Sequence, residues 1–182
     1  MSYAITPPQT MATLILAAIA LGCLAIGVRL FNVETSETWM AWSVGGSVVL
    51  VVALAGLFVY FLWGAFRSTV TIGNDSVRLQ VPIYAATVPL NSIDAEGARL
   101  LELTENREFK PAIRTNGLGI PGYQLGHFRL NNGHRARLAL TTRSSVAYVP
   151  LDRRTALLLS VEEGEDFIAA LKSAAARLEP AT

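Results

Sequence analysis

The strongest constraint on this chain is an apolar stretch, residues 39–66, that contains no charged residue. Between Trp42 and Trp63 a helix rises about 31 Å, roughly the thickness of the hydrocarbon core of a bilayer. Aromatic residues stand near both ends, where amphipathic rings favour the headgroup level; they are Trp39, Trp42, Tyr60, Trp63 and Phe66. Length, lack of charge and aromatic ends together predict a membrane-spanning helix rather than the core helix of a soluble protein.

A second apolar segment, residues 11–30, precedes it and runs for about twenty residues, enough to span a bilayer. A secretory signal peptide is the alternative, but the segment lacks a basic n-region and exceeds a usual h-region. The connecting residues 31–38 are few and polar, so the two helices run antiparallel. Small residues are expected to pack the helices together; they include Gly22, Gly27, Gly45, Gly46 and Gly56. Residues 1–66 are therefore predicted to form a transmembrane hairpin with helices at about 11–30 and 39–66.

The positive charges near the two spans predict the orientation. No Lys or Arg lies in residues 1–10, whereas Arg67 and Arg78 follow the second span. Because positive charge favours the cytoplasmic side, the C-terminal domain is expected in the cytoplasm. Arg29 argues the other way, but a long side chain at a helix end reaches either headgroup layer at little cost. The sequence predicts a multi-pass protein of the cell membrane, with the lipid bilayer as its first partner.

Charge is concentrated in the C-terminal part. Residues 67–182 hold 14 of the 15 Lys and Arg and 12 of the 14 Asp and Glu, a net charge near +2. Such a balance gives no strong field for nucleic acid, so no nucleic-acid partner is expected. The single cysteine, Cys23, lies in the first apolar segment, which excludes a disulfide framework and a thiolate metal site.

From residue 68 the pattern changes to short alternating runs broken by turn residues, which is typical of an all-β domain. The residues 73–75, Gly-Asn-Asp, predict a hairpin turn between the first two runs. Residues 91–103 have no clear assignment. About seven antiparallel strands are predicted, at 68–72, 76–81, 86–90, 123–130, 136–142, 146–151 and 156–161.

A helix is predicted to close the chain. Ser160 and Glu163 stand in a capping-box relation, and apolar residues recur at helical spacing from Phe167 to Leu178. Acidic residues come early and Lys172 comes late, which matches the helix dipole. The helix is expected to cover the open end of the sheet, because its acidic start disfavours the alternative of contact with anionic lipid.

Residues 114–128 read RTNGLGIPGYQLGHF, and a strand pair, Ser160 and the helix start at residues 166–168 follow. This order resembles the bacterial pleckstrin-homology-like (PH-like) domain family of small membrane proteins with two N-terminal spans. The resemblance covers residues 68–178 and implies a bent sheet sandwich closed by one C-terminal helix, over residues 67–182. It implies no activity, because the same fold hosts lipid binding, peptide binding and scaffolding.

The glycines at 117, 119 and 122 form a GxGxxG pattern. A dinucleotide site needs a helix directly after such a pattern, so that the pyrophosphate meets free N–H groups. Here Pro121 removes one donor and a predicted strand follows, so no nucleotide is expected. The pattern instead favours an irregular loop or bulge in which glycines permit positive φ.

The segment 105–127 is longer than a plain turn, and long segments of this kind are often functional. It is the predicted partner-binding loop, with candidate residues Lys110, Arg114, Asn116, Tyr123 and His127. The alternative is that Arg114 and Asn116 only satisfy backbone groups within the loop.

Lipid headgroups are the second candidate ligand. Eukaryotic relatives bind phosphoinositides through basic residues on the first hairpin, whereas residues 73–76 here carry only the acid Asp75. The candidates for a looser contact with anionic headgroups are four arginines: Arg67, Arg78, Arg153 and Arg154.

Catalysis has little support in the sequence. His127 and His134 are the two histidines, and no HExxH or GxSxG motif accompanies them. No enzyme activity, no cofactor and no metal site are therefore predicted. The leading interpretation is a non-catalytic, membrane-anchored module that recognises another membrane-associated protein through the 105–127 loop or an exposed sheet edge. The alternative is a sensor of anionic headgroups at the inner face of the membrane.

Overall fold

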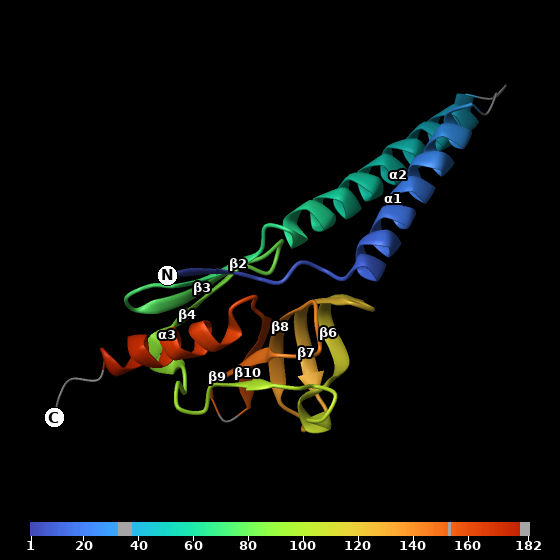
Figure 1. Cartoon of the computed structure of the whole chain (residues 1–182). Helices are drawn as coiled ribbons and strands as arrows, with labels where there is room; N and C mark the ends of the chain where they lie inside the picture. Colours follow the sequence, from blue (N-terminus) through green and yellow to red (C-terminus); the bar gives the residue numbers. More distant parts are fainter. Residues whose placement is uncertain (33–37, 153, 179–182) are drawn as a thin grey trace. The chain divides into compact units, whose positions relative to one another are not determined.

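The structure is a computed structural model that describes residues 1–32, 38–152 and 154–178. The chain forms two compact units: Thr10–Gly64 is helical, and Met1–Gln9 together with Ala65–Thr182 forms the second, mainly β unit (Figure 1). The predicted domain boundaries, 1–66 and 67–182, stay predictions. The assignment of Met1–Gln9 to the β unit was not anticipated.

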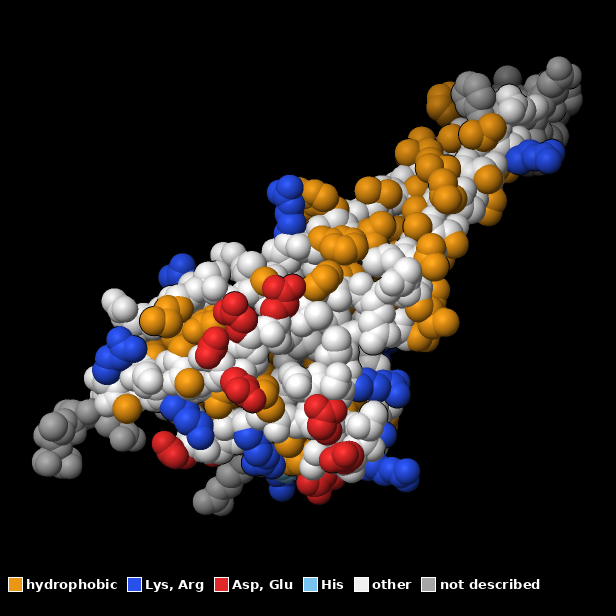
Figure 2. Space-filling view, viewed as in Figure 1, with side chains coloured by type: hydrophobic (Ala, Val, Ile, Leu, Met, Phe, Trp, Pro, Cys, Tyr) orange, Lys and Arg blue, Asp and Glu red, His pale blue; other side chains and the backbone are white. Residues whose placement is uncertain are grey.

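The helical unit contains α1 (Thr10–Phe31) and α2 (Thr38–Ala65), close to the predicted ranges. By length and composition both could cross a membrane, with a mean hydropathy of 2.5 in each. On the face that Figure 2 shows, apolar side chains lie along both helices, and the charged side chains lie mainly on the β unit. Gly27 lies against α2, since an added Cβ would be 3.7 Å from Val51 Cγ1. The other glycines predicted at this contact have no atom within 4 Å of an added Cβ: Gly22, Gly45, Gly46 and Gly56.

The β unit contains a four-stranded antiparallel sheet in the order β1-β2-β3-β4. Its strands are β1 (Ser2–Ala4), β2 (Thr69–Ile72), β3 (Ser76–Gln80) and β4 (Ala86–Pro89). The predicted hairpin between β2 and β3 is confirmed, with the Gly73 N–H donating to the Ser76 carbonyl at 2.8 Å.

The N-terminal segment forms part of this unit. β1 pairs with β2, the Met1 ammonium donates to the Ile72 carbonyl at 2.9 Å, and the Thr6 N–H donates to the Ser160 carbonyl at 2.8 Å. Ile5 is 5% exposed and bridges to Val161. Residues on both sides of the helical hairpin therefore belong to one sheet.

A six-stranded sheet follows, in the order β5-β9-β10-β8-β7-β6. Its strands are β5 (Arg99–Leu101), β6 (Pro111–Ile120), β7 (Tyr123–Leu130), β8 (Arg135–Leu140), β9 (Val146–Pro150) and β10 (Thr155–Ser160). β8 and β10 pair in parallel, which differs from the predicted antiparallel strands; the chain passes through β9, on the other side of β10, before it returns beside β8. The other neighbours are antiparallel. The described residues thus form ten strands, with β1, β5 and β6 added to the seven predicted.

The predicted loop over residues 105–127 is wrong for most of its length. β6 and β7 form a hairpin joined by Pro121 and Gly122, whose φ is 79°. The bulge predicted at the glycines 117–122 is wrong, because the pairing is regular from Asn116 to Ile120 and the two register shifts lie earlier, between Pro111 and Ile113 and between Arg114 and Asn116. The positive φ expected there is found at Gly117 and Gly122. Beyond these shifts Gly117 (φ 135°) faces Gly126 (φ 116°), and a Cβ on Gly117 would lie 2.9 Å from the Gly126 Cα. Only glycine tolerates this backbone conformation and approach.

The C-terminal helix α3 (Gly164–Ala176) contacts β2, β5 and β9, and so covers parts of both sheets (Figure 1). Two short 3₁₀ helices, η1 (Leu90–Ser92) and η2 (Arg107–Phe109), complete the elements. The predicted capping box is wrong, because α3 begins after Glu163 with no side-chain cap. Ser160 ends β10 instead, where its buried Oγ accepts the Thr141 N–H at 3.1 Å and the Thr142 N–H at 3.2 Å.

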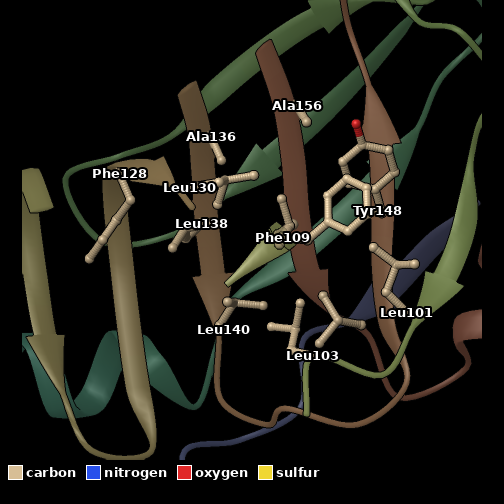
Figure 3. Close-up of a cluster of buried hydrophobic side chains, with 12 residues drawn as sticks. Leu101, Leu103, Phe109, Phe128, Leu130, Ala136, Leu138, Leu140, Tyr148 and Ala156 are labelled. Atoms are coloured by element: carbon tan, nitrogen blue, oxygen red, sulfur yellow. The ribbon is translucent and has the colours of Figure 1, made fainter. Parts of the chain in front are cut away.

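One apolar cluster fills the face of the six-stranded sheet that Phe109 of η2 covers, with members from β5, β7, β8, β9 and β10 (Figure 3). Phe109 and Tyr148 lie with ring centroids 4.8 Å apart, and the Arg99 guanidinium carbon is 5.3 Å from the Tyr148 centroid. Such cation–π contact stabilises the cluster from its rim. Leu103 and Leu140 belong to this cluster and also line the cleft described in the next section.

Candidate functional site

The outer edge of β6 is open. β6 is the last strand of its sheet and pairs only with β7 among the described residues. Residues 112–116 are exposed, and Ile113 keeps 59% of its surface. The register is regular from Asn116 to Ile120. In an antiparallel ladder alternate residues direct their N–H and C=O groups away from the neighbour, so this edge presents unpaired backbone groups.

Asn116 and His127 lie opposite each other on β6 and β7. Tyr84, from the β3–β4 loop, donates its hydroxyl to Asn116 Oδ1 at 3.0 Å, and its ring meets the His127 ring edge-on at 6.0 Å. Burial and then the charge of Arg137 lower the pKa of His127, so its imidazole is neutral at pH 7. Two predicted site residues are therefore brought together, and they serve to tie the β3–β4 loop to the edge strand.

Tyr84 follows a strained residue. Ile83 has φ 64° and is 61% exposed, an unusual conformation for a β-branched side chain. Sequence reasoning missed both residues because the loop offers no turn motif, and its contact with β6 is made only in the folded unit.

Arg114 extends along the exposed strand. Its Cδ lies 3.6 Å from the position that a Cβ on Gly119 would take. Within the described residues its guanidinium has no hydrogen bond or ion pair. Arg114 therefore offers a charge beside the regular part of the edge.

A cleft of about 610 Å³ is lined by the β6–β7 turn, by the segments after β5 and β8, and by Lys110 and Pro111 at the start of β6. Of the predicted residues it contains Lys110 and Tyr123. Arg143 and Glu102 also line it and were missed, because they are remote from the 105–127 segment in sequence. The lining residues are Gln9, Glu102, Leu103, Thr104, Lys110, Pro111, Ile120, Pro121, Gly122, Tyr123, Gln124, Leu140, Thr141, Thr142, Arg143 and Ser144.

The charges of the cleft are unequal. Glu102 is the one acid in the lining, and its Oε1 accepts the Ser145 N–H at 2.7 Å. The side chains of Lys110 and Arg143 form no hydrogen bond or ion pair with any described residue. Two cations are thus available in the cleft, while its carboxylate is engaged by the backbone.

Two buried hydroxyls border the cleft without a hydrogen-bond partner among the described residues: Tyr123 Oη and Thr141 Oγ1. The two residues are 3% and 2% exposed. Burial raises the pKa of Tyr123 to about 12, so the phenol stays protonated at pH 7. Buried hydroxyls without a partner cost about 1–3 kcal/mol each.

The headgroup candidates do not gather at one place. Arg78 is exposed on β3 of the four-stranded sheet, whereas Arg154 is exposed before β10 of the six-stranded sheet. Arg67 is exposed after α2, and Arg153 lies outside the described residues. The Arg154 N–H donates to Asp152 Oδ1 at 2.7 Å, and this bond is the main cause that lowers the pKa of Asp152. In the described part of the chain no group of three or more His, Cys, Asp or Glu could hold a metal ion.

Two sheets followed by a C-terminal helix, behind two candidate membrane spans, define a PH-like domain on a helical hairpin. The family model described as a bacterial PH domain matches residues 68–175, and the chain belongs to this family. The predicted fold class and the resemblance are thereby confirmed. No curated protein and no solved structure matches the chain. PH domains are generally non-catalytic interaction modules.

Proposed function

We propose that this protein is a non-catalytic, membrane-anchored interaction module that binds another membrane-associated protein by adding a strand of it to β6. The observation that carries the proposal is the unpaired outer edge of β6. Strand addition supplies affinity through main-chain hydrogen bonds, which need no catalytic or charged side chain on the edge itself.

The edge of β6 is protected in one half only. Bulges and charges are the usual means of blunting an exposed edge, and the first half of β6 has two register shifts and Arg114. Residues 116–120 contain no register shift and no charged residue. The other edge strands are shorter, since β1 and β5 have 3 residues each and β4 has 4.

Membrane anchoring is supported by the exposure of the helical unit. Only 22% of the apolar window of α1 and 11% of that of α2 is buried, and Val49 keeps 70% of its surface. A soluble core helix would be mostly buried, and a signal sequence would account for α1 alone. Lipid around both helices removes this apolar surface from water. A tether also raises the effective concentration of the domain for partners at the same membrane.

The cytoplasmic orientation is proposed from Arg67 and Arg78, which follow the second span. A phosphatase that is active only in the periplasm, fused after residue 182, should then be inactive. Activity of this fusion would reverse the orientation.

The edge is tested by photo-crosslinking in the native membrane. A photoreactive amino acid replaces Gly119, which is exposed in the regular stretch of β6, or Thr87, which is exposed on β4 of the other sheet as the control. We expect a protein adduct from position 119 and none from position 87. Lipid adducts alone at both positions would contradict protein recognition at β6 and favour the headgroup sensor.

A further inference from the structure

The open edge of β6 leads into the cleft. Ile120 ends the regular stretch of the strand and lines the cleft, as do Pro121 and Gly122 of the turn. A chain paired with residues 116–120 therefore runs to the part of the cleft that Ile120 lines. The cleft is then a continuation of the strand-addition site of the proposed function.

The cleft is suited to an anion. The side chains of Lys110 and Arg143 form no ion pair or hydrogen bond with a described residue, whereas the Glu102 carboxylate accepts a hydrogen bond from the Ser145 N–H. Guanidinium groups bind carboxylates in a bidentate manner, and an ammonium acts as a compact point charge. Hydroxyls of Thr104 and Ser144 are further donors in the lining. Its volume of about 610 Å³ exceeds what a single carboxylate needs, so neighbouring peptide atoms fit as well.

The walls of the cleft are partly apolar. Leu103, Ile120 and Leu140 line it beside the two cations. A peptide offers apolar side chains and a carboxylate at adjacent positions, and it also uses the open edge. A lipid headgroup uses the cations only, so the combination favours a peptide.

We propose that the cleft recognises a carboxylate of the peptide that adds to β6, with Arg143 and Lys110 as its cationic contacts. The carboxylate belongs either to the peptide's C-terminus or to an Asp or Glu side chain. This inference rests on the proposed function and specifies its partner as an acidic extended segment.

The experiment uses the full-length protein in nanodiscs of neutral lipid and pools of random neutral peptides of about eight residues, a common strand length or slightly longer. One pool has a free C-terminal carboxylate, a second is amidated, a third is amidated with a central Glu, and a fourth has Gln in its place. Retention of the free-acid or the Glu pool should exceed that of its neutral counterpart about tenfold, the value of one charged hydrogen bond. Whichever of the two is enriched identifies the source of the carboxylate.

The variant Lys110→Ala/Arg143→Ala should abolish this enrichment. Its control, Lys172→Ala/Arg154→Ala, removes the same charges outside the cleft and should keep the enrichment. The conservative variant Arg143→Lys should keep part of it. All four side chains are exposed or half-exposed, so the variants should melt like the parent chain.

Peptides with N-methyl groups at alternate positions separate the two proposals, because they cannot form a ladder with β6. If N-methylation removes all retention while carboxylates make no difference, strand addition stands and carboxylate recognition is overturned. If carboxylate pools are retained with or without N-methyl groups, the cleft stands and strand addition is overturned. Binding of anionic lipid vesicles that depends on Lys110 and Arg143, with no peptide retained, would overturn both.

Discussion

Removal of one oxygen atom at Tyr123 should stabilise the β unit. The Tyr123 hydroxyl is buried and has no hydrogen-bond partner among the described residues, so the folded state bears its desolvation cost. Mutational data place this cost at about 1–3 kcal/mol. We take the lower value, because removing the hydroxyl oxygen also removes its packing contacts with neighbouring atoms. Tyr123→Phe should therefore raise the free energy of unfolding by about 1 kcal/mol, or the melting temperature by about 4 °C.

The assay is calorimetry of the full-length protein in detergent. Tryptophan fluorescence would not report the unfolding of the β unit, because all three tryptophans lie in α2. Thr141→Val removes the second unpartnered hydroxyl at nearly constant shape and should shift the melting temperature in the same direction. A loss of about 1 kcal/mol in Tyr123→Phe would refute the reasoning, since it would mean that the hydroxyl is hydrogen-bonded in solution.

Tyr123 should also make the stability of the β unit depend on pH. Burial raises the pKa of Tyr123 to about 12 from an ordinary value of 10.0, so above pH 10 the unfolded chain releases a proton that the folded chain retains. Stability is therefore complete below pH 10 and falls as the pH rises towards 12, by about 2.7 kcal/mol in all. The pKa of Tyr148 is also raised by burial, so the parent chain loses stability there from two groups. Tyr123→Phe should show the smaller alkaline loss, and equal losses would contradict the assignment.

Three further substitutions test the packing of the β unit by the same calorimetry. Ile5→Ala should cost about 2–4 kcal/mol because Ile5 is 5% exposed, whereas Ile113→Ala, at 59% exposed, should change little; equal effects would mean that the N-terminal segment does not pack in solution. Gly126→Ala should be far more disruptive than Gly133→Ala, since both have positive φ but only the first would place a Cβ 2.7 Å from the backbone of β6. Ser160→Ala should cost about 1–3 kcal/mol by leaving two backbone amides after β8 without an acceptor, and no cost would contradict that role.

The elements that the sequence predicted correctly are those with a strong local signal. α1 and α2 are marked by length and composition, and β7 to β10 by alternation between turn residues. β1 was missed because three residues carry no period, and its partner β2 lies beyond both helices. β6 was missed because its exposed side chains give no alternation, and its glycines favour a loop interpretation.

The candidate site was only partly predictable. Lys110, Arg114, Asn116, Tyr123 and His127 were grouped because they are close in sequence, yet the hairpin sends them to different places. Asn116 and His127 meet Tyr84, while Lys110 and Tyr123 lie at the cleft with a distant arginine and glutamate. Contacts of this kind depend on the order of strands in the sheet, which no local pattern contains.

The uneven protection of β6 is the strongest reason to regard its edge as a binding surface. An edge that is merely tolerated is usually blunted along its length, because an open edge invites aggregation. Here both register shifts lie before Asn116, while residues 116–120 pair regularly with β7 and end at Ile120, which lines the cleft. Anchoring of the chain in a membrane restricts which proteins reach that stretch and raises the effective concentration of those that do. A short ladder over residues 116–120 then suffices for binding, provided that a second contact, such as a carboxylate in the cleft, selects the partner.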